Sequence, residues 1–163
     1  MFDGGKMKIA IVFYSFSGNT KRLALFLKEK LEENNHSVGV VEIKPAKEIN
    51  SFSLQALSAL LKKEAPLKKT EVNFDEFDLI IFGTPVWAFT ITPYLRSFLK
   101  NVNLEGKKTV CFVTFGSGIG SDKALKELEG ILKDKKAKVL FSFKVKDIKT
   151  KDKDYLQKLN LSL

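Results

Sequence analysis

Apolar runs alternate with helical patterns along this chain. The runs are rich in β-branched and aromatic residues and cover residues 8–14, 38–43, 78–83, 108–115 and 138–143. Short, almost continuously apolar runs are typical of strands buried on both faces of a parallel sheet. Helical spacing of leucines and related patterns predict helices near 23–31, 53–63, 93–100, 125–132 and 155–161. This order predicts an α/β domain in which a five-stranded parallel sheet lies between two layers of helices.

The loops at the carboxyl ends of the strands are the expected place for a ligand. In parallel sheets with helices on both faces, ligands bind beyond these strand ends, at the point where the strand order reverses. The loops at residues 15–20, 84–90 and 116–122 follow the first, third and fourth predicted strands. We therefore expect these three loops to form the binding site.

Length and composition indicate a single globular domain. The chain has 163 residues, of which 44% are hydrophobic and 29% charged, enough for a substantial core. Residues 1–6 are expected to be a flexible extension, with the domain covering residues 7–163. The start does not resemble a signal peptide, and no apolar run reaches the roughly 20 residues of a membrane helix. We expect a cytoplasmic protein without membrane insertion, as a monomer or a weak homodimer.

The sequence offers no metal site and no catalytic group of its own. One cysteine and one histidine cannot form a Cys/His zinc site within the chain. Cys111 lies in an apolar run and is expected to be a small buried hydrophobe. His36 lies in a polar stretch without a nucleophile motif, so we expect a solvated turn residue. Redox or transfer chemistry would therefore have to come from a cofactor.

The net charge of +9 raises the question of nucleic-acid binding. The lysines are spread along the chain and mixed with acidic residues, and no aromatic residues are interleaved with them in a base-stacking pattern. We therefore expect no nucleic-acid partner. The charge is expected to favour acidic partners through long-range attraction.

The first loop combines hydroxyl, amide and glycine groups directly before a helix. Ser15, Ser17 and Thr20 supply hydroxyls, Asn19 supplies an amide, and Gly18 lets a ligand approach the backbone. The helix start adds free N–H groups and a partial positive charge, which together suit a phosphate. The same residues could equally form an ordinary helix cap.

These residues resemble the phosphate loop of the flavodoxin family, T/S-x-T/S-G-x-T. The segments Gly-Thr-Pro-Val-Trp-Ala at 83–88 and Thr-Phe-Gly-Ser-Gly at 114–118 resemble the family's second and third flavin loops. The three motifs occur in the family's order and span most of the chain. The resemblance implies a flavodoxin-like three-layer sandwich with strand order 2-1-3-4-5.

The resemblance also implies FMN as the cofactor, with its ring between the second and third loops and Trp87 stacked on or beside it. The implied cofactor-binding residues are Ser15, Phe16, Ser17, Gly18, Asn19 and Thr20 in the first loop, Thr84, Pro85, Val86, Trp87, Ala88 and Phe89 in the second, and Phe115, Gly116, Ser117 and Gly118 in the third.

Three features depart from familiar patterns. Ala88 stands where many relatives carry a glycine able to adopt positive φ, a conformation that costs another residue about 1–2 kcal/mol. The third loop lacks the aromatic residue that covers one ring face in many flavodoxins. Residues 116–121 resemble a dinucleotide fingerprint, but they follow the fourth strand and end in serine, which disfavours NAD binding there.

Three functions follow from these features. The first is an FMN-dependent electron carrier between redox partner proteins. The second is an NAD(P)H-dependent FMN oxidoreductase acting on quinones or similar acceptors, which an open ring face would favour. The third is a binding module of the same fold without flavin. The lack of a long insertion that could form a nicotinamide pocket favours the carrier.

Overall fold

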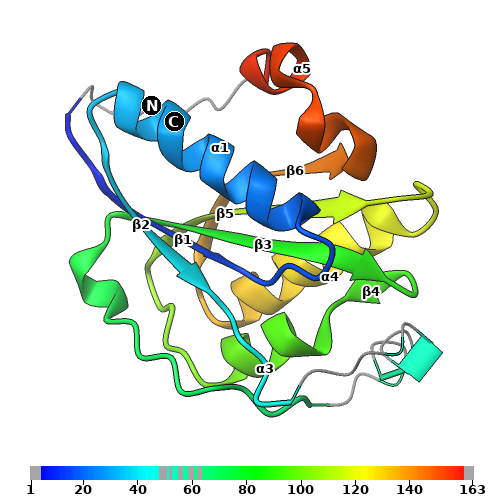
Figure 1. The fold of residues 1–163 in the computed structure, drawn as a ribbon. Helices are drawn as coiled ribbons and strands as arrows, with labels where there is room; N and C mark the ends of the chain where they lie inside the picture. Colours follow the sequence, from blue (N-terminus) through cyan, green and yellow to red (C-terminus); the bar gives the residue numbers. More distant parts are fainter. Residues whose placement is uncertain are drawn as a thin grey trace.

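Five parallel strands form the sheet of this protein in the order β2-β1-β3-β5-β6 (Figure 1). The computed structural model describes residues 5–47, 51, 53–54, 57–58, 61 and 64–159. The strands are β1 (Lys8–Phe13), β2 (Ser37–Glu42), β3 (Leu79–Trp87), β5 (Lys108–Phe115) and β6 (Lys138–Lys146). In chain order this parallel arrangement is 2-1-3-4-5, as expected.

A sixth strand was not expected. Strand β4 (Thr90–Ile91) pairs antiparallel with the end of β3, so that Val86 lies opposite Ile91 and Trp87 opposite Thr90. The predicted loop at 84–90 is therefore mostly strand, and β3 continues four residues past its predicted end at Gly83. The sequence pattern missed this because Pro85 is a residue that normally argues against a strand.

Helices cover both faces of the sheet. In the described ranges they are α1 (Asn19–Glu33), α3 (Pro93–Lys100), α4 (Ser121–Asp134) and α5 (Lys153–Gln157), together with the 3-10 helices η1 (Phe74–Glu76) and η2 (Asp147–Lys151). Helix α3 begins where Thr92 accepts a hydrogen bond from the backbone N–H of Leu95, with Pro93 in the first turn. Helix α5 begins at Lys153, two residues before its predicted start, because the Asp152 side chain caps the N–H of Tyr155.

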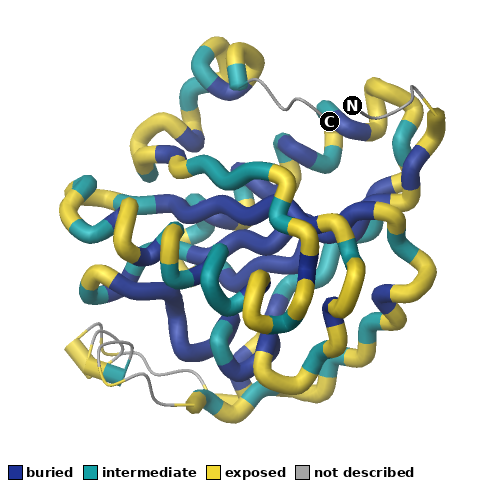
Figure 2. The backbone as a smooth tube through the Cα atoms, turned by 180° about the vertical axis from the view of Figure 1, so that it is seen from behind, coloured by how far each residue is buried: buried dark blue, intermediate teal, exposed yellow. Residues whose placement is uncertain are grey.

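The two sides of the sheet form separate cores. In β1, Ile9, Ile11 and Phe13 face the core that contains α1 and α5, whereas Ala10 and Val12 face the core that contains α3 and α4. Figure 2 shows the central strands buried along most of their length and the helices exposed on their outer sides. Cys111 is fully buried, as predicted, and burial raises the pKa of its thiol to about 12.

Several predictions fall at or beyond the limits of the described residues. Most of the helix predicted at 53–63 lies outside them, and the described Leu54, Leu57 and Leu61 are each at least half exposed. Residues 1–4 and 160–163 also lie outside, so the expected N-terminal extension stays a prediction. His36 is half-buried rather than solvated, since its Nδ1 accepts a hydrogen bond of 3.2 Å from the N–H of Met7.

Candidate functional site

The three loops meet at the carboxyl edge of the parallel strands, as expected. A cavity of about 420 Å³ lies between them. Its lining consists of Phe16 and Ser17 from the first loop, Pro85, Val86, Trp87, Ala88 and Phe89 from the second, Thr114, Phe115, Gly116, Ser117 and Ile119 from the third, and Asp147 after β6. Small-molecule sites commonly occupy about 300–1,000 Å³.

The other predicted site residues lie next to this lining. Ser15, Gly18, Asn19 and Thr20 form the turn into α1, whereas Thr84 is buried beneath the second loop. Gly118 belongs to the third loop but is not part of the lining. Among the lining residues, sequence reasoning did not select Thr114, Ile119 or Asp147. Asp147 was missed because the last strand was predicted to end at Phe143 and runs instead to Lys146.

The first loop is organised around its hydroxyl groups. Ser15 Oγ accepts a hydrogen bond of 3.2 Å from the backbone N–H of Lys21, and Ser17 Oγ accepts one of 3.1 Å from Asn19 Nδ2. Each serine is thus an acceptor within the loop, which leaves its own proton free for donation to a ligand. Gly18 precedes the helix with φ of 86°, a conformation that favours glycine. The loop therefore supplies both a helix cap and anion donors.

A threonine pair joins the first and third loops. Thr20 Oγ1 and Thr114 Oγ1 lie 2.8 Å apart, and both residues are buried. This hydroxyl therefore already has a protein partner, which distinguishes Thr20 from the two serines. Its position suits fixing the start of α1 against β5 more than direct anion binding.

The second loop is a tight hairpin with two residues at positive φ. Trp87 and Thr90 are paired, and between them Ala88 has φ of 45° and Phe89 has φ of 67°. Two-residue hairpins of this kind favour Asn-Gly or Gly-Gly, so an Ala-Phe turn is strained. The third loop packs directly on this turn, because a Cβ at Gly120 would lie 2.7 Å from Phe89 Cα. The third loop thus helps to hold the strained conformation.

Replacing Ala88 with glycine is expected to stabilise the protein by about 0.5–1 kcal/mol. Relief of the left-handed conformation contributes about 1–2 kcal/mol, and the greater freedom of glycine in the unfolded chain offsets about 0.4–1 kcal/mol. The urea midpoint of wild type and Ala88→Gly measures the difference. Gly130→Ala, in helix α4 with free space around its Cβ, is a control for the unfolded-state term alone. A lower midpoint for Ala88→Gly would contradict strain in the turn.

Trp87 lies at the base of the cavity within an aromatic cluster. Only 4% of its surface is exposed, and its ring makes edge contacts with Tyr14, Phe16 and Tyr94 at centroid distances of 5.6, 5.8 and 6.0 Å. Phe16 and Phe89, by contrast, are about half exposed at the mouth. Trp87 can therefore present one part of its ring to a ligand while the remainder stays packed in the core.

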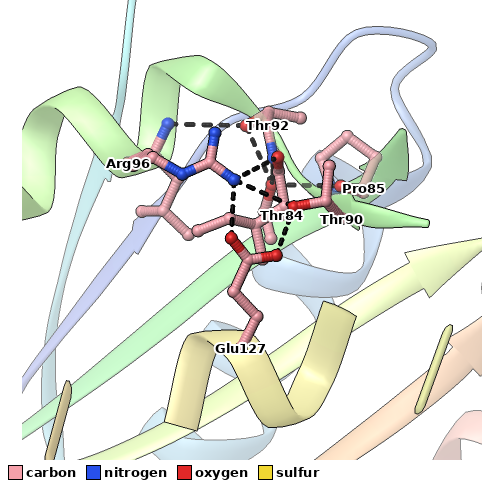
Figure 3. A network of polar contacts seen from close by, with 8 residues as sticks. Thr84, Pro85, Thr90, Thr92, Arg96 and Glu127 are labelled. Atoms are coloured by element: carbon pink, nitrogen blue, oxygen red, sulfur yellow. Dashed lines mark hydrogen bonds and ion pairs between the residues drawn. The ribbon is translucent and has the colours of Figure 1, made fainter. Parts of the chain in front are cut away.

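A buried ion pair holds the hairpin from below (Figure 3). Arg96 of α3 and Glu127 of α4 are 2.7 Å apart, and each side chain is 15% exposed. Thr90 lies between them, donating to Glu127 and accepting a hydrogen bond of 2.9 Å from Arg96. Thr84 and Thr92 continue the network, with their hydroxyl oxygens 2.9 Å apart. Two helices therefore fix the strand that follows the strained turn.

Asp147 is the one ionisable side chain in the described lining of the cavity. Burial raises the pKa of its carboxyl above the usual value, and the nearby polar side chains of Asn19 and Thr114 oppose this effect only in part. Its Oδ1 is buried and has no hydrogen-bond partner within the described ranges. A buried carboxylate oxygen without a hydrogen-bond partner destabilises a folded protein. A ligand could supply the missing donor, so Asp147 is a candidate for a role in binding.

Asp147→Asn is expected to stabilise the flavin-free protein at neutral pH. Because the pKa of Asp147 is higher in the folded than in the unfolded state, the wild-type protein loses stability as pH rises through these values. The advantage of the amide is therefore present above the folded-state pKa and disappears below the unfolded value of about 3.9. Urea denaturation between pH 3 and pH 8 measures it. An advantage that grows as pH falls would contradict the assignment.

A second cavity, of about 480 Å³, lies at the opposite edge of the sheet. It is lined by residues of the segments 70–75 and 101–107, which precede β3 and β5. Proteins with this type of sheet bind their ligands at the other ends of the strands, the carboxyl ends.

In the described ranges, no group of three or more His, Cys, Asp or Glu side chains is placed to hold a metal ion. The helices described there are also too short or too polar to cross a membrane.

Comparison with known proteins identifies the family. This chain belongs to the flavodoxin-like fold family, whose family model matches residues 7–160. It is 29% identical over 115 residues to the probable flavodoxin 1 of Bacillus subtilis (strain 168). That alignment covers 68% of this chain and 56% of the relative, so the chain matches little more than half of the relative's length.

Solved structures share the fold. A flavoprotein in complex with FMN from Lactobacillus acidophilus NCFM has a TM-score of 0.72 and 18% identity, covering 90% of this chain and 97% of that one. A putative flavoprotein of Bacteroides uniformis ATCC 8492 has a TM-score of 0.72 and 20% identity, covering 92% of this chain and 99% of that one. At these identities the likeness establishes the fold alone.

Proposed function

We propose that this protein binds FMN in the cavity between its three loops and carries electrons between redox partner proteins. The observation that carries the proposal is the convergence of a hydroxyl-rich helix start, an aromatic hairpin and a glycine loop on one cavity of about 420 Å³. The family membership and the FMN complex of a structural neighbour support the choice of cofactor.

The residues present fit the parts of FMN. Ser15 and Ser17, at the start of α1, have hydroxyl protons to donate to a phosphate. The hairpin and the third loop offer an apolar and aromatic slot for the ring, with Trp87 at its base. Asp147 has a buried oxygen without a partner in the described ranges, which suits a ligand that carries hydrogen-bond donors. Each chemical part of FMN therefore meets a matching group.

When bound, FMN supplies reversible uptake of one or two electrons. The residues that line the cavity hold FMN and exclude water from its buried side. They leave the mouth of the cavity open. Phe16, Phe89 and Ile119 are 49%, 48% and 71% exposed around that mouth, so a partner could approach closely. No second ionisable group lines the cavity within the described residues, which favours carrying electrons over acid–base chemistry. The excess of positive charge favours acidic partners.

The alternative function is an NAD(P)H-dependent FMN oxidoreductase that acts on quinones or similar acceptors. The open apolar mouth supports it, because a flat substrate could lie between Phe89 and Ile119 against an exposed ring face. The two functions differ in what reduces the flavin: a nicotinamide directly, or a protein partner.

Anaerobic addition of NADH or NADPH to the FMN-loaded protein separates them. For a carrier we expect flavin absorbance to remain after either nicotinamide alone and to bleach when a flavodoxin reductase is added. Free FMN at the same concentration serves as the control for direct reduction. Rapid bleaching by a nicotinamide alone would support the oxidoreductase instead, and failure to bind FMN would overturn both.

A further inference from the structure

Asp147 lies between the loop proposed for the phosphate and the loop proposed for the ring. Asn19 of the first loop and Thr114 of β5 lie near its carboxyl and lower the pKa of that group, and the Thr114 hydroxyl contacts Thr20. On the other side, a Cβ at Gly116 would lie 3.6 Å from Asp147 Oδ2. The carboxyl thus borders the path from the phosphate loop to the ring slot.

The position of Asp147 is fixed by a separate set of contacts. It begins η2, and its carbonyl accepts a hydrogen bond of 2.7 Å from Thr150 Oγ1. Arg22 of α1 donates to Thr150 Oγ1 and to Asn19 Oδ1, at 3.0 Å each. The 3-10 helix is therefore tied to the start of α1, which places the backbone of Asp147 beside the first loop.

We propose that Asp147 is a binding residue for the ribityl chain of FMN, with Oδ1 accepting a hydrogen bond from one of the ribityl hydroxyls. This inference rests on the proposed binding of FMN. It goes further because it assigns recognition of the sugar alcohol to a residue outside the three loops. An unpartnered buried acceptor needs a donor, and the ribityl chain joins the two ends of FMN between which Asp147 lies.

The chemistry of the other parts of FMN supports this choice. A phosphate is anionic and has mostly acceptors, so a carboxylate facing it would repel it. A ribityl hydroxyl is neutral and can donate its proton to the carboxylate. Hydrogen bonds with one ionised partner are about twice as strong as neutral ones. An acid at this position therefore favours a polyhydroxy chain.

The test is a double-mutant cycle in which the second change is made in the ligand. Wild-type protein, Asp147→Ala and Asp147→Asn are titrated with FMN and with its 2′-, 3′- and 4′-deoxy analogues, by flavin fluorescence. Asp122→Ala is the matched control, because Asp122 lies at the same edge of the sheet but outside the cavity, paired with Lys144 at 2.6 Å.

We expect Asp147→Ala to weaken FMN binding about tenfold or more, since a hydrogen bond to a charged group contributes at least this much. Asp147→Asn should have a smaller effect, and Asp122→Ala less than twofold. One deoxy analogue should bind wild type about tenfold more weakly than FMN, yet bind Asp147→Ala as well as FMN does. That loss of coupling identifies the hydroxyl.

Two results would overturn the inference while leaving FMN binding intact. Equal effects of Asp147→Ala on FMN and on all three deoxy analogues would show that the carboxyl contacts no ribityl hydroxyl. Tighter FMN binding by Asp147→Ala would show that the carboxyl faces the phosphate. Failure of the wild type to bind FMN would instead overturn the proposed function itself.

Discussion

Replacing both Ser15 and Ser17 with alanine is expected to weaken FMN binding by about 3–6 kcal/mol, because each hydrogen bond to a charged group contributes about 1.5–3 kcal/mol. Each serine oxygen already accepts a hydrogen bond within the loop, so its proton is directed to a ligand. Thr20 is left unchanged because its hydroxyl is bonded to Thr114. Fluorescence titrations with FMN and riboflavin measure the effect.

Riboflavin lacks the phosphate, so its affinity should change far less than that of FMN. The control is Ser117→Ala, which removes a hydroxyl from the cavity lining in the third loop, away from the first. It should leave the ratio of the two affinities unchanged. Equal weakening of FMN and riboflavin by the double variant would mean that the two serines do not bind the phosphate.

Glu127→Ala is expected to lower the free energy of unfolding by about 3–5 kcal/mol, the usual cost of removing one partner of a buried ion pair. Arg96 is only 15% exposed, and its Nη1 has no hydrogen-bond partner in the described part of the chain. Without Glu127 its charge would be left in the core. Thr90 would also lose its acceptor, and the hairpin that carries Ala88 and Phe89 would be less firmly held. Urea denaturation measures the loss.

Glu105→Ala is the matched control, because Glu105 pairs with Lys136 at the surface, where their side chains are 63% and 73% exposed. Its effect should stay within about 1 kcal/mol. Combining Glu127→Leu with Arg96→Met should recover most of the lost stability, since apolar residues of similar volume can replace a buried pair. A double variant no more stable than Glu127→Ala would contradict this explanation.

The sequence pattern was sufficient for a parallel sheet with helices on both faces, because continuous apolar runs between helical patterns leave few other arrangements. The order of the strands followed from the resemblance to the flavodoxin family. The sequence pattern also predicted that the segments 15–20, 84–90 and 116–122 meet at one edge of the sheet, since segments that follow parallel strands share that edge, but the segment 84–90 is mostly strand rather than loop. Strand β5 was predicted without error at either end, because Lys108 and the glycine after Phe115 mark it clearly. The carboxyl end of β6 was predicted three residues too early, since Lys144 and Lys146 interrupt its apolar pattern.

What only the tertiary structure decided concerns contacts between residues far apart in the chain. Ala88 and Phe89 adopt positive φ because the Arg96–Glu127 pair and Gly120 hold their hairpin, and no local signal announces that. Thr20 turns its hydroxyl to Thr114, 94 residues away, rather than to the loop. Asp147 reaches the cavity only because β6 runs three residues past its predicted end at Phe143. Local pattern thus determined most of the elements and the edge of the sheet at which the candidate site lies, whereas long-range packing determined which side chains line its cavity.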